Sequence, residues 1–548
     1  MIRSRTIKDL KNIEDAVLEC AKSYNRKIPE IRFFVLNSDE FMSLLEKKVY
    51  PFSPANIWEG KNVIKRRYMS DIGRETGIYY EVVQCGNPSY AYLNENNSLT
   101  TQASVMAHVI GHCEFSEINV LKDSDPFRTE YAMFLTKKIE TSIKNMGVDK
   151  YTSFWNACES VIPLVSPNSQ YSLKNSVETD SPDLFHDNIS SKTENDKLYK
   201  SYSSTLDTIL SPIDSKKIYK EDLENKNKRE EISRHGYKLK CPCQDILGFL
   251  KEYAPASESE KYIMEYMYFV ARHHDFIAKT QIMNEGWSMY WEKKIMADLF
   301  KQNVVKDVID YCRIFSGVCY PRPFFMRNPY HMGYHMWKHI EESYKKGKIS
   351  LAYNEETDRE IKNNWNKGSD VEPIKQMDHL VGTITDYEFI RRFLTHDLID
   401  ELYLNRITIE WALKLGLITS SQPEDLIIRA DNKYIYLSQD FVKKQMLDFF
   451  SDYYAPMIYI VDTEFNDGGL LLYHRHKGVN LRYDWIPPTL SNINKIWKSP
   501  VYLMTGSKFY RVSGKEMGVA DIKNVPFEEI RNRMLSGQKP FEYQKDQK

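Results

Sequence analysis

Two histidines four residues apart, His108 and His112 in AHVIGHCEF, form the densest cluster of side chains that could do chemistry. A helix turns about 100° per residue, so this spacing leaves the two imidazoles about 40° apart on one face. That geometry lets a helix offer two nitrogens to one zinc ion. Gly111 between them would let another backbone or a ligand come close. The same face carries Val105 and Phe115, so a pair of hydrogen-bonded core histidines is the alternative.

A second signal lies in QIMNEGWSMYWEKKIM at 281–296, where Glu285 and Glu292 share one helical face with apolar side chains. A carboxylate on an apolar face needs a cation, a metal or hydrogen-bond donors, because burying it unpaired costs several kcal/mol. Two histidines and a carboxylate form a common open zinc set, with the fourth position left for water. We therefore predict a divalent-metal site, zinc foremost, at His108, His112 and Glu285. Pairing of the carboxylate with an arginine or lysine, or exposure to solvent, is the alternative.

The metal hypothesis lacks a general base. In the zinc-peptidase motif HExxH a glutamate follows the first histidine and activates water, whereas this chain has Val109. Glu114 falls about 130° or more around the helix from the histidines, so it cannot take that role within one helix. We expect Glu292 or Tyr92 to handle the proton instead, as the catalytic residues.

Other clusters favour structural roles. His331, His335 and His339 drift by about 80° around one helix, so that only adjacent pairs could share an ion. Cys241 and Cys243 are separated by one residue, which does not match zinc-ligand spacing. Neither a phosphate-binding glycine loop nor a G-x-S-x-G elbow occurs in the sequence.

Composition narrows the class of protein. The 548 residues carry 75 Lys and Arg against 76 Asp and Glu, so the chain lacks the overall basic charge of a nucleic-acid-binding protein. No stretch approaches the 18 consecutive apolar residues of a membrane span, and the charged N-terminus does not resemble a secretory signal. The eight cysteines are most simply reduced thiols. We expect a cytoplasmic protein that does not bind nucleic acid and has no membrane span.

Periodicity predicts a mainly α fold with an α+β C-terminal part. Residues 1–350 are expected to form a helical domain that carries both motifs, with a polar insertion at 168–233, and 380–548 a smaller α+β domain. Strands are predicted over 31–38 and 78–93, and helices over 7–24, 101–121, 130–147, 244–254, 258–272, 279–299, 302–314 and 329–346.

Several of these stretches together resemble the stage V sporulation protein R (SpoVR) family. Four separated motifs occur in the family's order, and the C-terminal run LLLYHRHKGVNLRYDWIPPTLSNINKIWKSPVYLMT also matches. One departure is Glu292, where the family usually has a histidine; the exchange keeps a metal-ligating side chain. The four motifs are QCGNPSYAYLNENNSL (84–99), QASVMAHVIGHCEF (102–115), AKTQIMNEGWSMYW (278–291) and NPYHMGYHMWKHIE (328–341).

The resemblance implies a role in sporulation, in formation of the spore cortex or in cell-envelope metabolism. It also implies a PrkA-type serine kinase and a von Willebrand-like protein as partners. The motifs H-x-x-x-H and N-E-G resemble a gluzincin peptidase without its general base, which implies a zinc-peptidase-like helical core and peptidoglycan peptides as substrate. Two hypotheses follow: a zinc-dependent amide hydrolase with a degenerate site, or a non-catalytic regulator or scaffold.

Overall fold

The structure is a computed structural model. Nearly all of the predicted polar insertion at 168–233 lies outside the residues that it describes. Among the described helices, none combines the length and the apolar character needed to cross a bilayer. The described residues are 2–37, 40–41, 44, 82–86, 88–121, 128–167, 177–178, 238–369, 371–417, 426–452, 455–476 and 480–542.

The chain forms two units, each built from two separate stretches of sequence. Residues 1–129 and 276–454 form the first unit, and residues 130–275 and 455–548 form the second. The long helix α11 (Glu258–Lys301) contributes residues to both units. This grouping differs from the sequential division into 1–350 and 380–548 that periodicity suggested. It places both chemical motifs, which lie on α4 and on the later part of α11, in the first unit.

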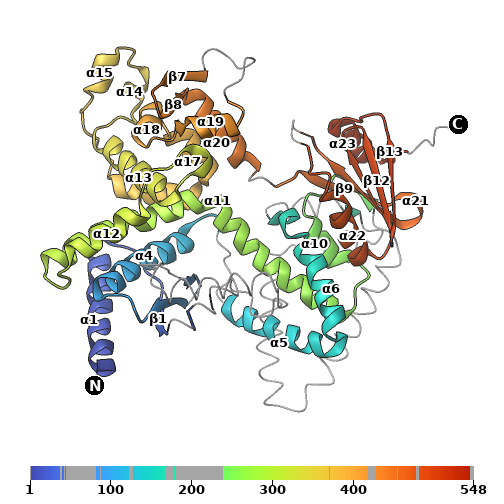
Figure 1. Cartoon of the computed structure of the whole chain (residues 1–548), viewed down its shortest axis with the longest axis horizontal. Coiled ribbons are helices and arrows are strands. Elements are labelled where there is room, and N and C mark those ends of the chain that lie inside the picture. The colour runs from blue at the N-terminus through green and yellow to red at the C-terminus, as the bar shows by residue number, and fades with distance from the viewer. Residues whose placement is uncertain are drawn as a thin grey trace. The chain divides into compact units, whose positions relative to one another are not determined.

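The first unit is built around α4 (Leu99–Ile118). Ser98 caps this helix because its side chain accepts a hydrogen bond from the Thr101 backbone N–H at 3.1 Å. Every residue from Thr100 to Phe115 is buried, so α4 is a central helix covered on all sides rather than an amphipathic surface helix. In Figure 1 it lies beside α1 (Ile2–Ser23) and α12 (Val308–Val318).

Two glycine crossings bring α11 close to its neighbours in this unit. A side chain at Gly111 of α4 would place its Cβ 2.5 Å from the Cα of Ser288 in α11. A side chain at Gly286 of α11 would place its Cβ 2.2 Å from the backbone carbonyl carbon of Gly333, in α13 (Pro329–Lys345). These helices therefore touch backbone to backbone, which only glycine permits. The close approach that the sequence suggested at Gly111 is confirmed.

The remaining elements of the first unit surround this core. One small sheet has the order β1-β3-β2, with β1 parallel to β3, and another has the order β6-β8-β7. The strands are β1 (Ile31–Leu36), β2 (Val82–Gln84), β3 (Ser89–Asn94), β6 (Arg406–Thr408), β7 (Ile427–Ala430) and β8 (Tyr434–Leu437). The further helices are α14 (Leu351–Glu355), α15 (Arg359–Asn363), α16 (Pro373–Thr383), α17 (Asp386–Phe393), α18 (His396–Glu401), α19 (Ile409–Lys414) and α20 (Gln439–Asp452).

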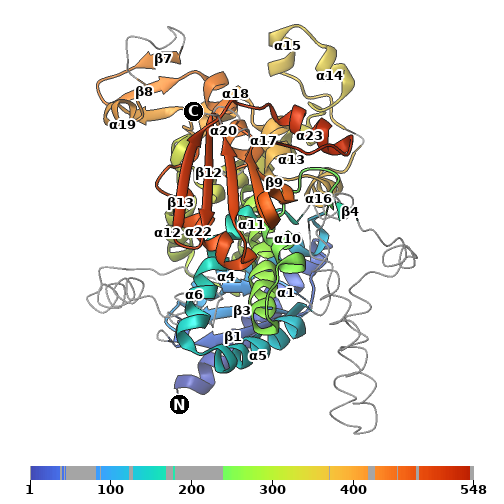
Figure 2. The ribbon, with the colours of Figure 1, turned by 90° about the vertical axis from the view of Figure 1, so that its right-hand side faces the viewer.

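The second unit contains a five-stranded sheet of order β13-β12-β11-β10-β9, in which only β10 and β11 pair in parallel. Figure 2 shows β13 and β12 next to each other at one side of this sheet and β9 toward its other side. Its strands are β9 (Ile458–Glu464), β10 (Gly469–His474), β11 (Val501–Thr505), β12 (Lys508–Ser513) and β13 (Glu516–Asp521). Helices and short strands complete the unit: α5 (Arg128–Met146), α6 (Val148–Glu159), α10 (Ile246–Tyr253), α21 (Phe465–Gly468), α22 (Ile486–Trp497), α23 (Phe527–Leu535), β4 (Val177–Glu178) and β5 (Lys238–Leu239).

A mainly helical chain with a sheet near its C-terminus is therefore confirmed. Three predicted elements differ from the structure. The strand predicted over 78–93 contains two strands among its described residues, β2 and β3, and the helix predicted over 302–314 is α12, which begins at Val308. Residues 258–272 and 279–299 belong to the single helix α11 rather than to two helices. In the structure Thr280 is buried and donates its hydroxyl hydrogen bond to the Phe276 carbonyl oxygen at 2.8 Å, which satisfies its polar group without ending the helix.

Candidate metal centre

Three donor side chains converge between α4 and α11. The Glu285 Oε2 atom lies 3.3 Å from His112 Nε2 and 3.6 Å from His108 Nε2. All three candidate ligand atoms lie within 4.8 Å of one another, and within the described residues they are the one such group of three. The structure thus brings together the three residues that the sequence predicted as metal ligands.

Both imidazoles are held by hydrogen bonds on the side away from this cluster. The Glu292 Oε2 atom lies 2.8 Å from His108 Nδ1, and its other oxygen accepts a hydrogen bond from the Ser104 hydroxyl at 2.6 Å. The Asn284 Oδ1 atom lies 2.8 Å from His112 Nδ1. Each Nδ1 atom thus has an oxygen atom as its hydrogen-bond partner, which orients the ring so that Nε2 lies toward Glu285.

The three donor side chains are largely buried, and one of them is a carboxylate. The His108 side chain is 0% exposed and that of Glu285 is 19% exposed. Burial would raise the pKa of Glu285, but the His112 and His108 imidazoles outweigh it and hold that pKa below its usual value, so the carboxyl is ionised. Its Oε2 atom is buried and makes no hydrogen bond to the described residues. A buried carboxylate this close to two imidazole nitrogens needs a positive charge beside it, either a proton on an imidazole or a metal ion.

The spacing of the donors fits a metal ion. Zinc holds nitrogen and oxygen ligands at about 2.0–2.2 Å in tetrahedral geometry, which puts two such ligands about 3.3–3.6 Å apart. The two separations from Glu285, 3.3 and 3.6 Å, lie in this range. The backing of each histidine by an oxygen acceptor is also the usual arrangement behind metal-bound imidazole.

Glu114 has a structural role on the opposite side of α4. Its Oε1 atom accepts from the Lys27 backbone N–H at 3.0 Å and lies 3.3 Å from the Arg26 guanidinium, while Oε2 accepts from Trp287 Nε1 at 3.2 Å. Arg26 also binds Asp378 through two nitrogen–oxygen contacts of 2.7 and 3.2 Å. Since α4 continues to Ile118, Glu114 stays turned away from the histidines, as its position in the helix predicts.

Glu292 and Tyr92, the two residues predicted to handle a proton, both contact other side chains in the structure. Glu292 is 1% exposed and sits behind His108, where it orients the ring. Burial and then the Glu292 carboxylate raise the pKa of the neighbouring Tyr311 phenol far above its usual value. Tyr92 lies on β3, where its ring stacks on that of Phe34 in β1 at 5.7 Å. A catalytic role for Glu292 or Tyr92 stays a prediction.

The rival histidines occupy α13. The rings of His331 and His335 are 4.6 Å apart, and burial lowers the pKa of His331, His335 and His339. In the described residues, these histidines form no group of three close donors. The structure therefore agrees with their interpretation as neutral side chains bordering a core.

Four residues of the site were not found from the sequence. Ser104 lies one helical turn before His108, a spacing that could have revealed it. Asn284 directly precedes Glu285 and gave no helical-face signal of its own. Tyr330 places its ring 6.0 Å from that of His108. Asp386 accepts hydrogen bonds from the backbone N–H groups of residues 282 and 283 at 2.8 and 2.9 Å, and so fixes the backbone just before Asn284.

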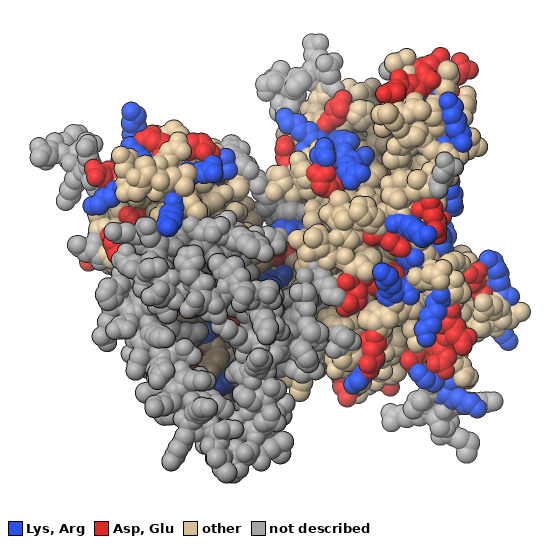
Figure 3. All heavy atoms as spheres, turned by 180° about the vertical axis from the view of Figure 1, so that it is seen from behind, with Lys and Arg blue, Asp and Glu red and all other residues tan. Residues whose placement is uncertain are grey.

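Charge on the surface is mixed. On the face shown in Figure 3, basic and acidic side chains of the described residues are interspersed. This agrees with the nearly balanced totals of the sequence, 75 basic and 76 acidic residues. The predicted absence of nucleic-acid binding stays a prediction.

The fold and the site together define a mainly helical protein with a buried cluster of two histidines and a glutamate on two crossing helices. The family model described as SpoVR like protein matches residues 4–416. The chain therefore belongs to the SpoVR family, as its motifs indicated.

One curated protein is similar to this chain over part of its length. The uncharacterized protein YcgB of Escherichia coli (strain K12) is 24% identical over 334 residues, which cover 59% of this chain. The match spans 61% of the length of YcgB. No solved structure matches the chain, so the predicted likeness to a zinc-peptidase core stays a prediction.

Proposed function

We propose that this SpoVR-family protein binds one divalent metal ion, zinc foremost, through His108, His112 and Glu285, and uses it in sporulation or cell-envelope metabolism. The convergence of the three donor atoms supports the proposal most directly. Each imidazole has its Nδ1 atom 2.8 Å from an oxygen of Glu292 or Asn284, so that its other nitrogen lies toward Glu285. The separations of 3.3 and 3.6 Å suit ligands that share one ion.

The proposed chemistry is hydrolysis of an amide bond, with peptidoglycan peptides as the substrate class. A bound zinc ion supplies Lewis-acid polarisation of a carbonyl group and of water. Glu292 and Asn284 orient the two imidazoles through their Nδ1 atoms. Tyr330, whose ring lies 6.0 Å from that of His108, is the nearest phenol for which a ring contact with the cluster is described, and we assign it the role of proton donor.

A second candidate is a non-catalytic regulator or scaffold that acts with a PrkA-type serine kinase and a von Willebrand-like protein. Two observations favour it. Val109, at the position of the usual general base, is buried in the core. Glu292, the other carboxylate predicted to act as a base, lies 2.8 Å from His108 Nδ1, on the side of the ring away from the cluster. In this case the same three ligands hold a structural ion.

Elemental analysis of the purified full-length protein tests the metal site. We expect about one zinc ion per chain in the wild type and strong loss in Glu285→Gln and His112→Ala. His335→Ala removes a half-buried histidine of the same unit outside the cluster, so it should keep its metal. Metal-free wild-type protein, with unchanged stability in the cluster variants, would contradict the proposal.

A cleavage assay with muropeptides then distinguishes the hydrolase from the non-catalytic regulator. For a hydrolase, the metal-loaded protein releases a new amino group from muropeptides, and Tyr330→Phe slows this release while leaving the zinc content unchanged. If the wild type holds its metal and cleaves no muropeptide, the regulator is favoured. Recovery of a kinase in a pull-down that depends on the metal would then support it further.

A further inference from the structure

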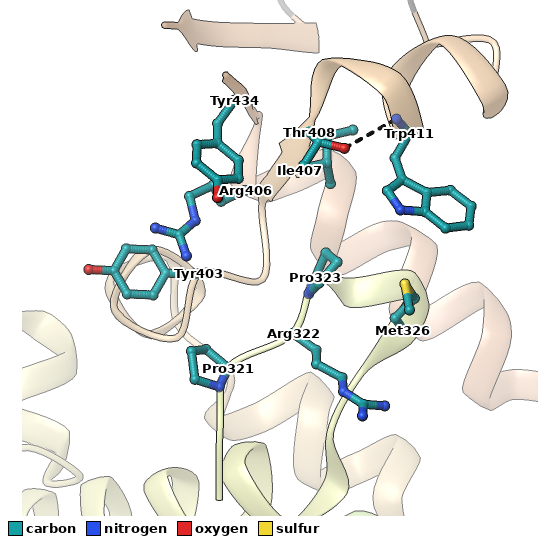
Figure 4. Close-up of a pocket in the computed structure, with 10 residues that line it drawn as sticks. All are labelled: Pro321, Arg322, Pro323, Met326, Tyr403, Arg406, Ile407, Thr408, Trp411 and Tyr434. Carbon is teal, nitrogen blue, oxygen red and sulfur yellow. Dashed lines mark hydrogen bonds between the residues drawn. The ribbon is translucent and has the colours of Figure 1, made fainter. Parts of the chain in front are cut away.

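The first unit contains a hollow of about 190 Å³ that is separate from the metal cluster (Figure 4). It lies between the segment before α13 and the small sheet of β6, β7 and β8. Cofactor and drug-sized sites usually enclose about 300–1,000 Å³, so this hollow fits one or two side chains rather than a cofactor. It is lined by Pro321, Arg322, Pro323, Met326, Tyr403, Arg406, Ile407, Thr408, Trp411 and Tyr434.

Arg406 is held in place at one end of the hollow. Its guanidinium carbon lies 4.0 Å from the ring centre of Tyr403 and 4.9 Å from that of Tyr434, and Figure 4 shows it between the two rings. In the part of the chain that the structure describes, no acidic side chain forms an ion pair with Arg406 or Arg322. The pKa of the nearby Asp431 is lowered by the backbone N–H groups of Lys433 and Tyr434, from which it accepts hydrogen bonds, and to a smaller extent by Arg406. A guanidinium fixed on aromatic rings keeps its N–H donors available for a carboxylate.

Tyr403 has a backbone conformation that tyrosine rarely adopts. Its φ is 55°, in the left-handed region that costs a residue with a Cβ about 1–2 kcal/mol. It follows the end of α18, where the Tyr403 N–H donates to the Asp400 carbonyl and the Leu404 N–H to the Ile399 carbonyl. Glycine is the usual residue at this position of a helix end. The contact between the Tyr403 ring and Arg406 is therefore a reason for a tyrosine, rather than a glycine, at this strained position.

The other end of the hollow is apolar and exposed. Met326 is 43% exposed and Trp411 is 38% exposed, and Figure 4 shows their side chains on the same side of Pro323. The apolar surface continues along α19 and beyond its end, where Leu413 and Leu415 are 60% and 43% exposed. A ligand with an acidic group and an adjacent apolar group would match both ends.

We propose that this hollow binds a peptide segment of a partner protein in which an acidic side chain stands next to an apolar one. The carboxylate pairs with Arg406, and the apolar side chain packs on Trp411 and Met326. Binding of this kind needs no metal, so the proposal is independent of the proposed metal chemistry.

A library of random twelve-residue peptides displayed on phage tests this proposal. Selection on the immobilised full-length protein, with counter-selection on Arg406→Glu, should enrich peptides that carry Asp or Glu beside an apolar residue. For a synthetic peptide of the enriched sequence, Arg406→Glu should weaken binding at least tenfold in fluorescence anisotropy. Replacing the peptide's acidic residue with Lys should restore binding to Arg406→Glu. Arg392→Glu is the matched control, because Arg392 is exposed, lies 5.1 Å from the ring centre of Phe393 and is outside the hollow.

Tyr403→Gly separates recognition from folding. This variant relieves the left-handed strain and removes the ring, so we expect unchanged or higher thermal stability together with at least threefold weaker peptide binding. The proposal is overturned if no acidic peptides are enriched, or if the enriched peptides bind Arg406→Glu and Tyr403→Gly as they bind the wild type. Loss of binding in Arg392→Glu as large as in Arg406→Glu would also overturn it, as would binding of anionic lipid vesicles through Arg406 without any enriched peptide.

Discussion

Gly286→Ala should destabilise the first unit by pushing α11 away from α13. The added Cβ would lie 2.2 Å from the carbonyl carbon of Gly333 and 2.3 Å from its Cα, where ordinary contacts begin near 3.4 Å. The helices must therefore separate by about 1 Å, since the obstacle is backbone that cannot rotate away. Overpacking of this kind costs about 1–3 kcal/mol, and alanine returns about 1 kcal/mol of helix propensity. We expect a net loss of up to about 2 kcal/mol.

Gly317→Ala is the matched control. Gly317 also lies in a helix, α12, but nothing stands within 4 Å of an added Cβ. Helix propensity alone should then raise stability by about 0.5–1 kcal/mol. Urea denaturation followed by tryptophan fluorescence measures both variants, because Trp287 and Trp337 are buried with their ring centres 5.0 Å apart. Gly286→Ala as stable as Gly317→Ala would refute the close helix crossing.

Three further predictions concern buried polar groups. Glu292→Gln should weaken zinc binding by about 10–100-fold in a chelator competition, because it removes the carboxylate behind His108; an affinity equal to the wild type would show that Glu292 does not orient the ring. Burial raises the pKa of Asp386 from 3.8 to about 8, so its contribution to stability is complete below pH 3.8 and is lost as the pH rises to about 8. The free energy of unfolding of the wild type should therefore fall between pH 5 and 8 by up to about 1.4 kcal/mol per pH unit, and Asp386→Asn, measured by urea denaturation, should lose this slope. Arg26→Met should cost about 3–5 kcal/mol because Glu114, whose side chain is 3% exposed, loses its cation, and adding Glu114→Gln should recover part of that loss.

Sequence spacing predicted the candidate ligands because both motifs lie on regular helices. The four-residue spacing of His108 and His112 places the two imidazoles on one face of α4, and Glu285 lies on the face of α11 toward them. The ends of single elements were also predictable from local chemistry: Asn328 caps α13 and Pro329 begins it. These signals come from residues that are close together in the sequence, so they can be recognised without knowing the fold.

Contacts between distant residues were not predictable in this way. Arg26 and Asp378 are 352 positions apart, and nothing in either local sequence points to the other. The same limit applies to Glu292. The sequence shows only a carboxylate on one helical face, and its position behind His108 follows from the fold. The hollow at Arg406 joins segments around residues 322, 406 and 434, so its chemistry exists only after folding.

Zinc-edge X-ray absorption of the zinc-loaded full-length protein tests the central claim most directly. We predict nitrogen and oxygen ligands at about 2.0–2.2 Å, with the outer-shell scattering of two imidazoles and no sulfur. Glu285→Gln should lower the zinc affinity. A sulfur shell at about 2.3 Å, or a wild-type protein that takes up no zinc, would contradict a site formed by His108, His112 and Glu285.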